Sequence, residues 1–178
     1  MTKEEARNIY LGKRRFMERN VVALYSQKIK QNLAENFDFE GKNVSVFTSV
    51  EAQNEVSTKN LLDISKVNVY APVMQPKRQL LHINITSDTT WKQNDWGILE
   101  PADTDIALSP DLFDFVIVPL VVADKKGYRV GYGGGYYDRF LAKCNSDCIF
   151  IGIGFYDLID KISDLDEFDI PLHFYVSP

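Results

Sequence analysis

The chain contains few cysteines and histidines, on which zinc and thiol chemistry depend. Its 178 residues include two cysteines and two histidines. Cys144 and Cys148 are spaced C-x3-C, whereas zinc and redox motifs usually have C-x2-C, and there is no second pair. The sequence also lacks His-x3-His and Glu-x2-His pairs. We therefore expect two reduced, inert thiols at a helix end and no tightly held zinc.

Long apolar runs and hydrolase motifs are absent as well. No apolar run approaches 18 residues, so no membrane span and no membrane partner are expected. The first residues, Met-Thr-Lys-Glu-Glu, are charged and unlike a signal peptide, which favours a cytoplasmic location. Nucleophilic hydrolysis has no support, because there is no Gly-x-Ser-x-Gly motif and no candidate Cys–His pair.

Basic charge is in the minority. Lys and Arg total 20 against 25 Asp and Glu, which gives a net charge of −5. Because non-specific nucleic-acid binding needs a basic face, we do not expect it here. An anionic ligand must then be held by locally placed Lys and Arg. A hydrophobic content of 45% can build a sizeable core, and the length predicts a single domain, residues 1–178.

Two helical patterns stand at the start of the chain. Thr2 followed by Glu5 is a capping box, which predicts a helix start. An apolar stripe at helical spacing then runs from Val22 to Leu33. Gly12 weakens the first part, so one long helix and two helices with a joint remain equally open.

Strand patterns dominate the rest. We expect a short strand over 43–47, one over 67–73 that ends near Pro72, and a half-exposed strand over 81–85 with His82 on its polar face. Ser57 is expected to cap a short helix through Ser65, and Trp91–Leu108 is expected to be a loop. The strongest strand covers 115–122 and is apolar on both faces, with Pro119 at a bulge or edge, and another covers 149–154. Strands separated by helices predict an α/β fold with a mainly parallel open sheet covered by helices.

A glycine-rich run is the leading functional candidate. Four of the five residues from Gly131 to Gly135 are glycine, and the run lies between the 115–122 strand and a helix-like segment, Tyr136–Lys143. Such a loop can approach a phosphate closely and point backbone N–H groups at it. It is neither a P-loop nor a dinucleotide fingerprint, because Tyr136 stands where the third glycine should be. A glycine-rich surface turn is the alternative.

The charged and aromatic neighbours of this run each allow two interpretations. Asp138 fits either a Mg²⁺ ligand or an acid that stabilises a helix start. Arg139 fits a phosphate contact or a surface ion pair, and Tyr136 and Tyr137 fit a pocket wall or i,i+4 packing. Lys3 and Arg7, four residues apart, fit an anion contact or a solvated helix face.

A family resemblance narrows these choices. "GYRVGYGGGYYDRFL" at 127–141, preceded by "DFVIVPLVVAD", resembles the signature of 5-formyltetrahydrofolate cyclo-ligases, also called 5,10-methenyltetrahydrofolate synthetases. Weaker similarities follow in the expected order: Lys3-x3-Arg7, Glu55-Val56, "GILEP" at 97–101 and "FDIPL" at 168–172.

The chain departs from the family pattern at several positions. The family usually has Gly-x-Ala-Phe-Asp where this chain has Leu120-Val-Val-Ala123-Asp124. It often has His-Asp in place of Phe168-Asp169, and a small polar or acidic residue in place of His173. These departures concern the shape of the pocket wall rather than the glycine loop.

The resemblance implies a three-layer, Rossmann-like sandwich and an ATP- and Mg²⁺-dependent ligase. It would cyclise 5-formyltetrahydrofolate to 5,10-methenyltetrahydrofolate through a phosphorylated formyl intermediate, with release of ADP and phosphate. The residues that it assigns to ATP are Lys3, Arg7, Gly131, Tyr132, Gly133, Gly134, Gly135, Tyr136, Tyr137, Asp138 and Arg139. Those that it assigns to folate are Val50, Glu55, Gly134, Gly135, Tyr136 and Tyr137.

Within that set Asp138 is the expected Mg²⁺ ligand and Arg139 the expected catalytic residue. Arg14 and Arg15 are given less weight. Two alternative functions stay open: a phosphotransferase of similar fold acting on another small molecule, and a non-catalytic regulator that binds folate or a nucleotide. The sequence does not give the oligomeric state, and a monomer is the working expectation.

Overall fold

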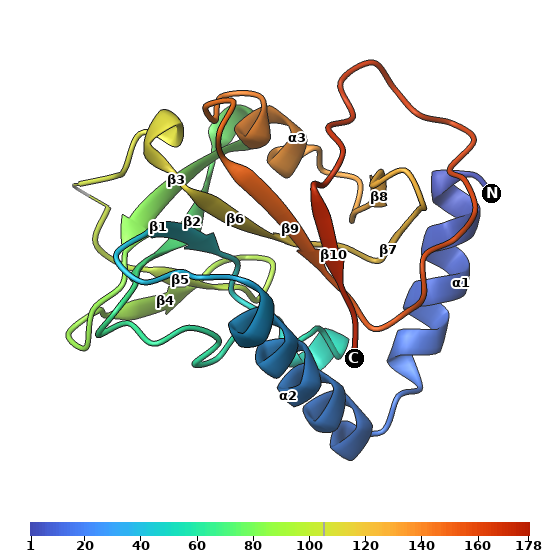
Figure 1. Cartoon of the computed structure of the whole chain (residues 1–178), viewed down its shortest axis with the longest axis horizontal. Helices are drawn as coiled ribbons and strands as arrows, with labels where there is room; N and C mark the ends of the chain where they lie inside the picture. The colour runs from blue at the N-terminus through green and yellow to red at the C-terminus, as the bar shows by residue number, and fades with distance from the viewer. Residues whose placement is uncertain (105) are drawn as a thin grey trace.

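The centre of the protein is a six-stranded sheet (Figure 1). The computed structural model describes residues 1–104 and 106–178. In spatial order the strands are β10 (Phe174–Val176), β9 (Ile149–Ile153), β6 (Phe115–Pro119), β1 (Asn43–Val46), β2 (Asn68–Gln75) and β3 (Gln79–Asn84). All neighbours are parallel except β2 and β3. The predicted mainly parallel open sheet is confirmed.

Helices, 3-10 turns and two small hairpins surround this sheet. The helices are α1 (Lys3–Arg15), α2 (Arg19–Asn36) and α3 (Tyr136–Leu141), with 3-10 turns η1 (Glu51–Gln53), η2 (Pro76–Arg78) and η3 (Pro110–Leu112). Two small hairpins pair β4 (Trp91–Gln93) with β5 (Leu99–Pro101) and β7 (Val122–Ala123) with β8 (Arg129–Val130). No helix in the described residues has the length and apolar character needed to cross a bilayer.

The first helix begins where the capping pattern predicts. The Thr2 side chain accepts a hydrogen bond from the Glu5 N–H, and the Glu5 carboxylate accepts one from the Thr2 N–H. Of the two open alternatives, the structure has two helices. The joint lies at 16–18 rather than at Gly12, which stays inside α1.

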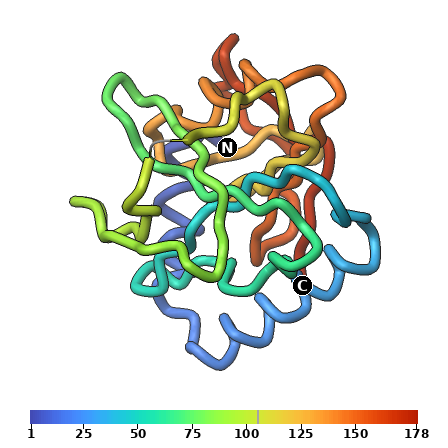
Figure 2. The backbone as a smooth tube through the Cα atoms, turned by 90° about the vertical axis from the view of Figure 1, so that its left-hand side faces the viewer, coloured from blue at the N-terminus to red at the C-terminus, as the bar shows by residue number. Residues whose placement is uncertain are grey.

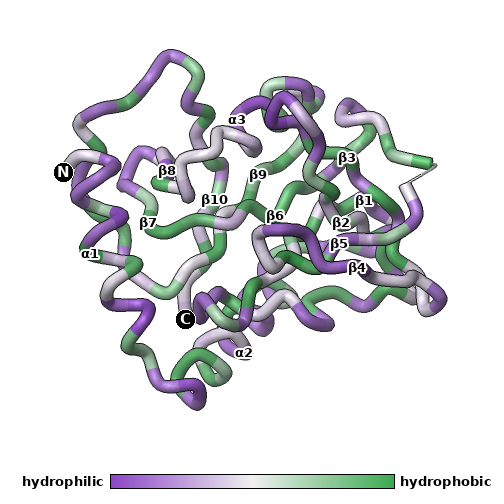
Figure 3. Tube along the Cα trace, turned by 180° about the vertical axis from the view of Figure 1, so that it is seen from behind, coloured by the Kyte–Doolittle hydropathy of each residue, from purple (hydrophilic) through white to green (hydrophobic). Residues whose placement is uncertain are grey.

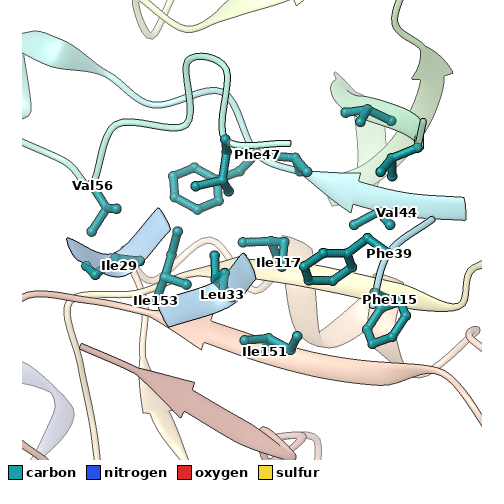
Figure 4. Close-up of a cluster of buried hydrophobic side chains, with 14 of the residues drawn as sticks. Ile29, Leu33, Phe39, Val44, Phe47, Val56, Phe115, Ile117, Ile151 and Ile153 are labelled. Atoms are coloured by element: carbon teal, nitrogen blue, oxygen red, sulfur yellow. The ribbon is translucent and has the colours of Figure 1, made fainter. Parts of the chain in front are cut away.

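The sheet is buried on both faces, which confirms the three-layer α/β fold. On one face, Ile29 and Leu33 of α2 pack against alternate sheet residues such as Ile117 (Figure 4). On the other face, Phe140 and Leu141 of α3 pack in a second cluster built on Val116 and Val118. Alternation along β6 therefore supplies both cores, as expected for a central parallel strand.

Helix α1 lies against the β7–β8 hairpin rather than over the large sheet (Figure 1). Ala6 of α1 is fully buried and clusters with Val122 and Val130. Much of α1 is hydrophilic, whereas β6 and β9 are hydrophobic (Figure 3). Helix α2 runs beside the C-terminal end of the chain (Figure 2), where the Asn32 side chain donates to the Ser177 carbonyl.

Several local expectations were wrong. Residues 57–65 form turns rather than a helix, and strand β2 continues past Pro72 to Gln75. Pro72 is accommodated because its register partner His82 turns its carbonyl away from β2 to accept from Leu108 N–H, and because the pairing of β2 with β1 ends at Tyr70. Pro119 is the last residue of β6, so the apolar run 115–122 is one strand followed by a new hairpin.

Two further corrections concern the antiparallel edge. The predicted loop Trp91–Leu108, which includes Asp105 outside the described residues, contains the β4–β5 hairpin. His82 is not on a polar face but is 1% exposed, with its ring stacked on Phe140 at 4.0 Å and near Phe113. Strand β10, which no pattern indicated, completes the opposite edge.

Candidate functional site

The candidate site lies beyond the carboxyl ends of three parallel strands, β1, β6 and β9. This is where open α/β sheets bind their ligands. A small cavity of about 10 Å³, room for about one water molecule, is found there. Its lining residues are Arg14, Phe47, Glu55, Val56, Pro119, Leu120, Val121, Ile153, Gly154, Phe155 and Tyr156.

The glycine loop connects β8 to α3. Gly133 has φ +94° and Gly135 has φ +66°, backbone conformations that side-chain-bearing residues rarely adopt. Gly134 differs, because a Cβ there would lie 2.8 Å from Cδ2 of Tyr136 and the Tyr136 ring would have to shift. The loop backbone is therefore shaped by its glycines.

One face of α1 brings basic side chains to the site. Lys3, Arg7 and Arg14, separated by four and seven residues, share a helical face. Arg7 Nε donates to the Gly131 carbonyl at 2.8 Å. Lys3 Nζ instead forms an ion pair with Asp169 Oδ2 at 2.5 Å. The structure thus places Arg7 directly on the glycine loop and Lys3 beside a carboxylate.

Glu55 is 7% exposed and is held from two directions. Its Oε2 accepts from the Val50 N–H at 2.7 Å, and its Oε1 accepts from the Tyr132 hydroxyl. Burial, followed by the nearby Glu55 carboxylate, raises the pKa of the Tyr132 phenol above its usual value, so the phenol keeps its proton. Glu55 therefore links the Val50 backbone to the glycine loop at Tyr132.

Tyr137 contributes a buried hydroxyl to the same region. Burial, then the charge of Glu55, raises the pKa of Tyr137. Its hydroxyl has no hydrogen-bond partner in the described part of the chain. A buried donor without a partner is unfavourable by about 1–3 kcal/mol, so a ligand acceptor at this position would satisfy it.

Asp138 has a structural partner that the sequence interpretation did not include. Its Oδ1 accepts from Arg129 Nη2 at 2.7 Å and from the Ile170 N–H at 3.3 Å. The Arg129 side chain is 5% exposed and also donates to the Ile170 carbonyl. Asp138 thus ties α3 to β8 and to the segment that carries Asp169.

The oxygen donors in this region suit a hard cation more than zinc. No group of three or more His, Cys, Asp and Glu residues is gathered for a metal within 1–104 and 106–178. Mg²⁺ needs only one or two carboxylates when a nucleotide supplies phosphate oxygens. Asp138, with Asp169 next to its hydrogen-bond partner Ile170, fits that requirement.

The remaining predicted residues lie in or next to the loop. Arg139 is exposed, and its Nη1 donates to the Gly135 carbonyl at 3.0 Å. Tyr136 opens α3 with its ring against Gly134. The structure therefore places most of the predicted ATP residues in or next to one loop, with Glu55 at one side of it, whereas Lys3 is paired with Asp169.

Sequence reasoning missed Arg129 and Asp169 and gave too little weight to Arg14. Arg129 and Asp169 lie within the "GYRVGYGGG" and "FDIPL" segments, so those segments carried the signal. Arg14 continues the spacing of Lys3 and Arg7 on α1, which was the available clue. Arg15 is exposed and outside the site.

Among the departures from the family pattern, Leu120 alone lines the small cavity. Ala123 is buried in β7, and Phe168 is exposed. His173 Nδ1 accepts from the Phe150 N–H at 2.9 Å. The two cysteines are free, with Cys148 buried.

Comparison with known proteins agrees with these features. A sequence model of the 5-formyltetrahydrofolate cyclo-ligase family matches residues 1–167. The chain is 33% identical over 166 residues to a 5-formyltetrahydrofolate cyclo-ligase of Haemophilus influenzae, covering 86% of this chain and 87% of the relative. It is 32% identical over 151 residues to that of Escherichia coli K12, covering 76% and 77%.

Solved structures show the same fold. A 5,10-methenyltetrahydrofolate synthetase from Aquifex aeolicus superposes with a TM-score of 0.83 at 26% identity, covering 99% of this chain and 89% of the other. One from Mycoplasma pneumoniae superposes with a TM-score of 0.76 at 22% identity, covering 99% of both. With the glycine loop, the basic face of α1 and the match over nearly its whole length, the chain belongs to the 5-formyltetrahydrofolate cyclo-ligase family.

Proposed function

We propose that this chain is an ATP- and Mg²⁺-dependent 5-formyltetrahydrofolate cyclo-ligase that acts as a monomer, with residues 1–178 as one domain. The observation that carries the proposal is the position of two adjacent loop residues. The Gly131 carbonyl accepts a hydrogen bond from the Arg7 side chain, and the Tyr132 hydroxyl donates one to the Glu55 carboxylate. One short loop therefore joins a cation suited to phosphate with a carboxylate suited to the N–H donors of a pterin.

The proposed reaction begins with transfer of the ATP γ-phosphoryl group to the formyl oxygen. N10 of the folate then attacks the formyl carbon and releases its proton to solvent. The bond from that carbon to its oxygen breaks, and the oxygen leaves with the phosphate. Ring closure gives 5,10-methenyltetrahydrofolate, with ADP and phosphate as the other products.

The protein's contribution is positioning and charge stabilisation, as in other phosphoryl transfers. Arg7, Lys3 and the N–H groups of residues 131–135 would hold the phosphates. Arg139, next to Gly135, would stabilise charge on the transferring group. Mg²⁺, held in part by Asp138, would neutralise phosphate charge.

Glu55 would orient the pterin, with Val50, Tyr136 and Tyr137 around it. The cavity of about 10 Å³ is far smaller than a pterin. Occupation of this cavity by a pterin would therefore require the side chains around it to move. The proposal places the reaction in the cytoplasm, where both free thiols would stay reduced.

The test follows absorbance of the methenyl product in a complete mixture and in mixtures lacking ATP or Mg²⁺. We expect product in the complete mixture alone. ATP turnover with other small molecules but not with 5-formyltetrahydrofolate would favour a phosphotransferase. Binding of folate and ATP without any turnover would favour a regulator, and either result would contradict the proposal.

A further inference from the structure

Arg14 is a buried cation without an ion-pair partner. Its residue is 5% exposed, and none of the ion pairs in the described chain involves it. Its Nε is buried with no hydrogen-bond partner among the described residues. A charge removed from water is expensive unless something compensates it, so the position of Arg14 requires an explanation.

The Arg14 guanidinium is connected to Glu55 by two hydrogen bonds that share the Tyr132 hydroxyl. Arg14 Nη2 donates to the Tyr132 hydroxyl at 2.6 Å, and its Cζ lies 5.3 Å from the ring centroid. The same hydroxyl donates to Glu55 Oε1. Charge-assisted hydrogen bonds in series polarise one another, so Arg14 and Glu55 are linked through a single phenol oxygen.

The backbone near Glu55 is also fastened to Arg14. Asn54 Nδ2 donates to the Arg14 carbonyl at 3.0 Å and to the Met17 carbonyl at 3.2 Å. Asn54 has φ +49°, a conformation that asparagine tolerates better than most residues. The end of α1 thus fixes both the segment that carries Glu55 and the Glu55 carboxylate itself.

We propose that Arg14 is a positioning residue for the folate half of the site, acting through the Tyr132 hydroxyl to aim the Glu55 carboxylate at the N–H donors of the pterin. This inference rests on the proposed function, since it names what Glu55 binds. Arg14 and Glu55 line the same small cavity, which places the linked groups where the substrate would enter.

The test is a double-mutant cycle on the full chain with Arg14→Lys, Tyr132→Phe and the combined variant. Arg14→Lys keeps the charge but replaces the planar donor fork, and Tyr132→Phe removes the linking hydroxyl. Arg15→Lys makes the same chemical change at the neighbouring exposed residue and serves as the matched control. Calorimetry measures the affinities for 5-formyltetrahydrofolate and for ATP separately.

Each single change should weaken folate binding about tenfold, the scale of a lost charge-assisted hydrogen bond. ATP affinity should stay within about twofold, because Tyr132 is proposed to meet the phosphates through its backbone N–H, which Tyr132→Phe keeps. Both affinities of Arg15→Lys should also stay within about twofold. The folate affinity of the double variant should lie within about twofold of that of the single variant that binds folate more weakly. The reason is that Arg14 and Tyr132 both act on the Glu55 carboxylate.

Additive losses in the double variant would overturn the inference, as would unchanged folate affinity in Tyr132→Phe. Tighter folate binding by Tyr132→Phe would also overturn it, because the hydroxyl would then compete with the substrate for Glu55. If Arg14→Lys does not fold, Tyr132→Phe alone decides, since Tyr132 as a whole residue is 44% exposed and the change removes only its hydroxyl. Failure of the unaltered protein to bind folate would instead contradict the proposed function.

Discussion

Glu55 illustrates how a single carboxylate is prepared for a ligand by its neighbours. Val50 and Tyr132 donate to its two oxygens, and both contacts restrict its orientation. An orientation fixed before binding reduces the entropy lost when a ligand binds. The buried Tyr137 hydroxyl adds a donor that no described residue satisfies.

Replacing Glu55 with Gln keeps its size but removes the charge. Because a hydrogen bond to a charged group contributes about 1.5–3 kcal/mol, affinity for 5-formyltetrahydrofolate should fall by about one to two orders of magnitude. ATP affinity should not change. Calorimetric titrations measure both, with Glu51→Gln as the control because Glu51 is exposed four residues away. Equal folate affinity in the two variants would remove Glu55 from the site.

Asp138 has both a structural partner and a proposed metal role, and these separate experimentally. Asp138→Asn should lower stability, because it leaves the buried Arg129 guanidinium without its ion-pair partner. If Asp138 also holds Mg²⁺, the Mg²⁺ concentration for half-maximal rate should rise severalfold, about 1 kcal/mol or more of lost metal affinity. Thermal unfolding and a Mg²⁺ titration measure the two effects. A titration that superimposes on that of the unaltered protein would restrict Asp138 to the structural role.

At this scale the sequence was informative about residue types but not about partners. The glycine run, Arg7 and Glu55 could be selected from the resemblance, and Arg7 could be placed on a basic helix face from its spacing. The contacts of Asp138 with Arg129 and of Lys3 with Asp169 depend on segments far apart in the chain. No local pattern specifies such contacts, so the structure was needed to find them.

Among the elements, the glycine loop depends on backbone conformations that favour glycine. Helix α1 instead depends on the regular spacing of its side chains. Gly133 and Gly135 adopt positive φ, and Gly134 is in close contact with Tyr136. In α1, by contrast, Gly12 has no such requirement, since a Cβ there would meet no atom within 4 Å. These glycines should therefore respond differently to substitution.

Gly134→Val should weaken ATP binding at least tenfold, about 1.4 kcal/mol, because the new side chain must displace the Tyr136 ring. Gly12→Ala is the control and should instead stabilise the protein by roughly 0.5–1 kcal/mol, since alanine is the better helix former. Nucleotide titration and denaturant unfolding measure the two outcomes. Unchanged ATP affinity in folded Gly134→Val would contradict the phosphate role of the loop.

Element prediction succeeded where side-chain periodicity was strong and failed where it was short or ambiguous. Strands β6 and β9, predicted over 115–122 and 149–154, and the capped start of α1 were found because burial on both faces and the capping box leave clear patterns, although β6 ends three residues early. The three-residue strands β4, β5 and β10 are too short to show alternation. His82 was assigned to the wrong face because its environment is created by Phe113 and Phe140 from other elements.

At the scale of the whole molecule, strand order and the packing of α1 on the β7–β8 hairpin depend on long-range contacts. The class of fold could be predicted from alternating strands and helices, whereas the order β10-β9-β6-β1-β2-β3 could not. The same packing buries one ionisable group away from the site. Burial lowers the pKa of His82 to about 3.

This shift should make the whole protein less stable in acid. Unfolded chains bind a proton at histidine near pH 6.5, whereas folded His82 does so only near 3. Between these values the unfolded state binds more protons, so stability falls as pH decreases, by up to about 1.4 kcal/mol per pH unit. His82→Leu should lack this component, and unfolding free energies from pH 7 to 4 would show it. Curves that stay parallel would contradict the expected titration of His82.

The proposed chemistry is tested most directly by following the formyl oxygen. The substrate is prepared with ¹⁸O in its formyl group and converted with unlabelled ATP and Mg²⁺ in unlabelled water. Because phosphoryl transfer to that oxygen precedes ring closure in the proposed mechanism, mass spectrometry should find the ¹⁸O in the released phosphate. Recovery of the label in water, with unlabelled phosphate, would show that the γ-phosphoryl group never reached the formyl oxygen and would contradict the mechanism.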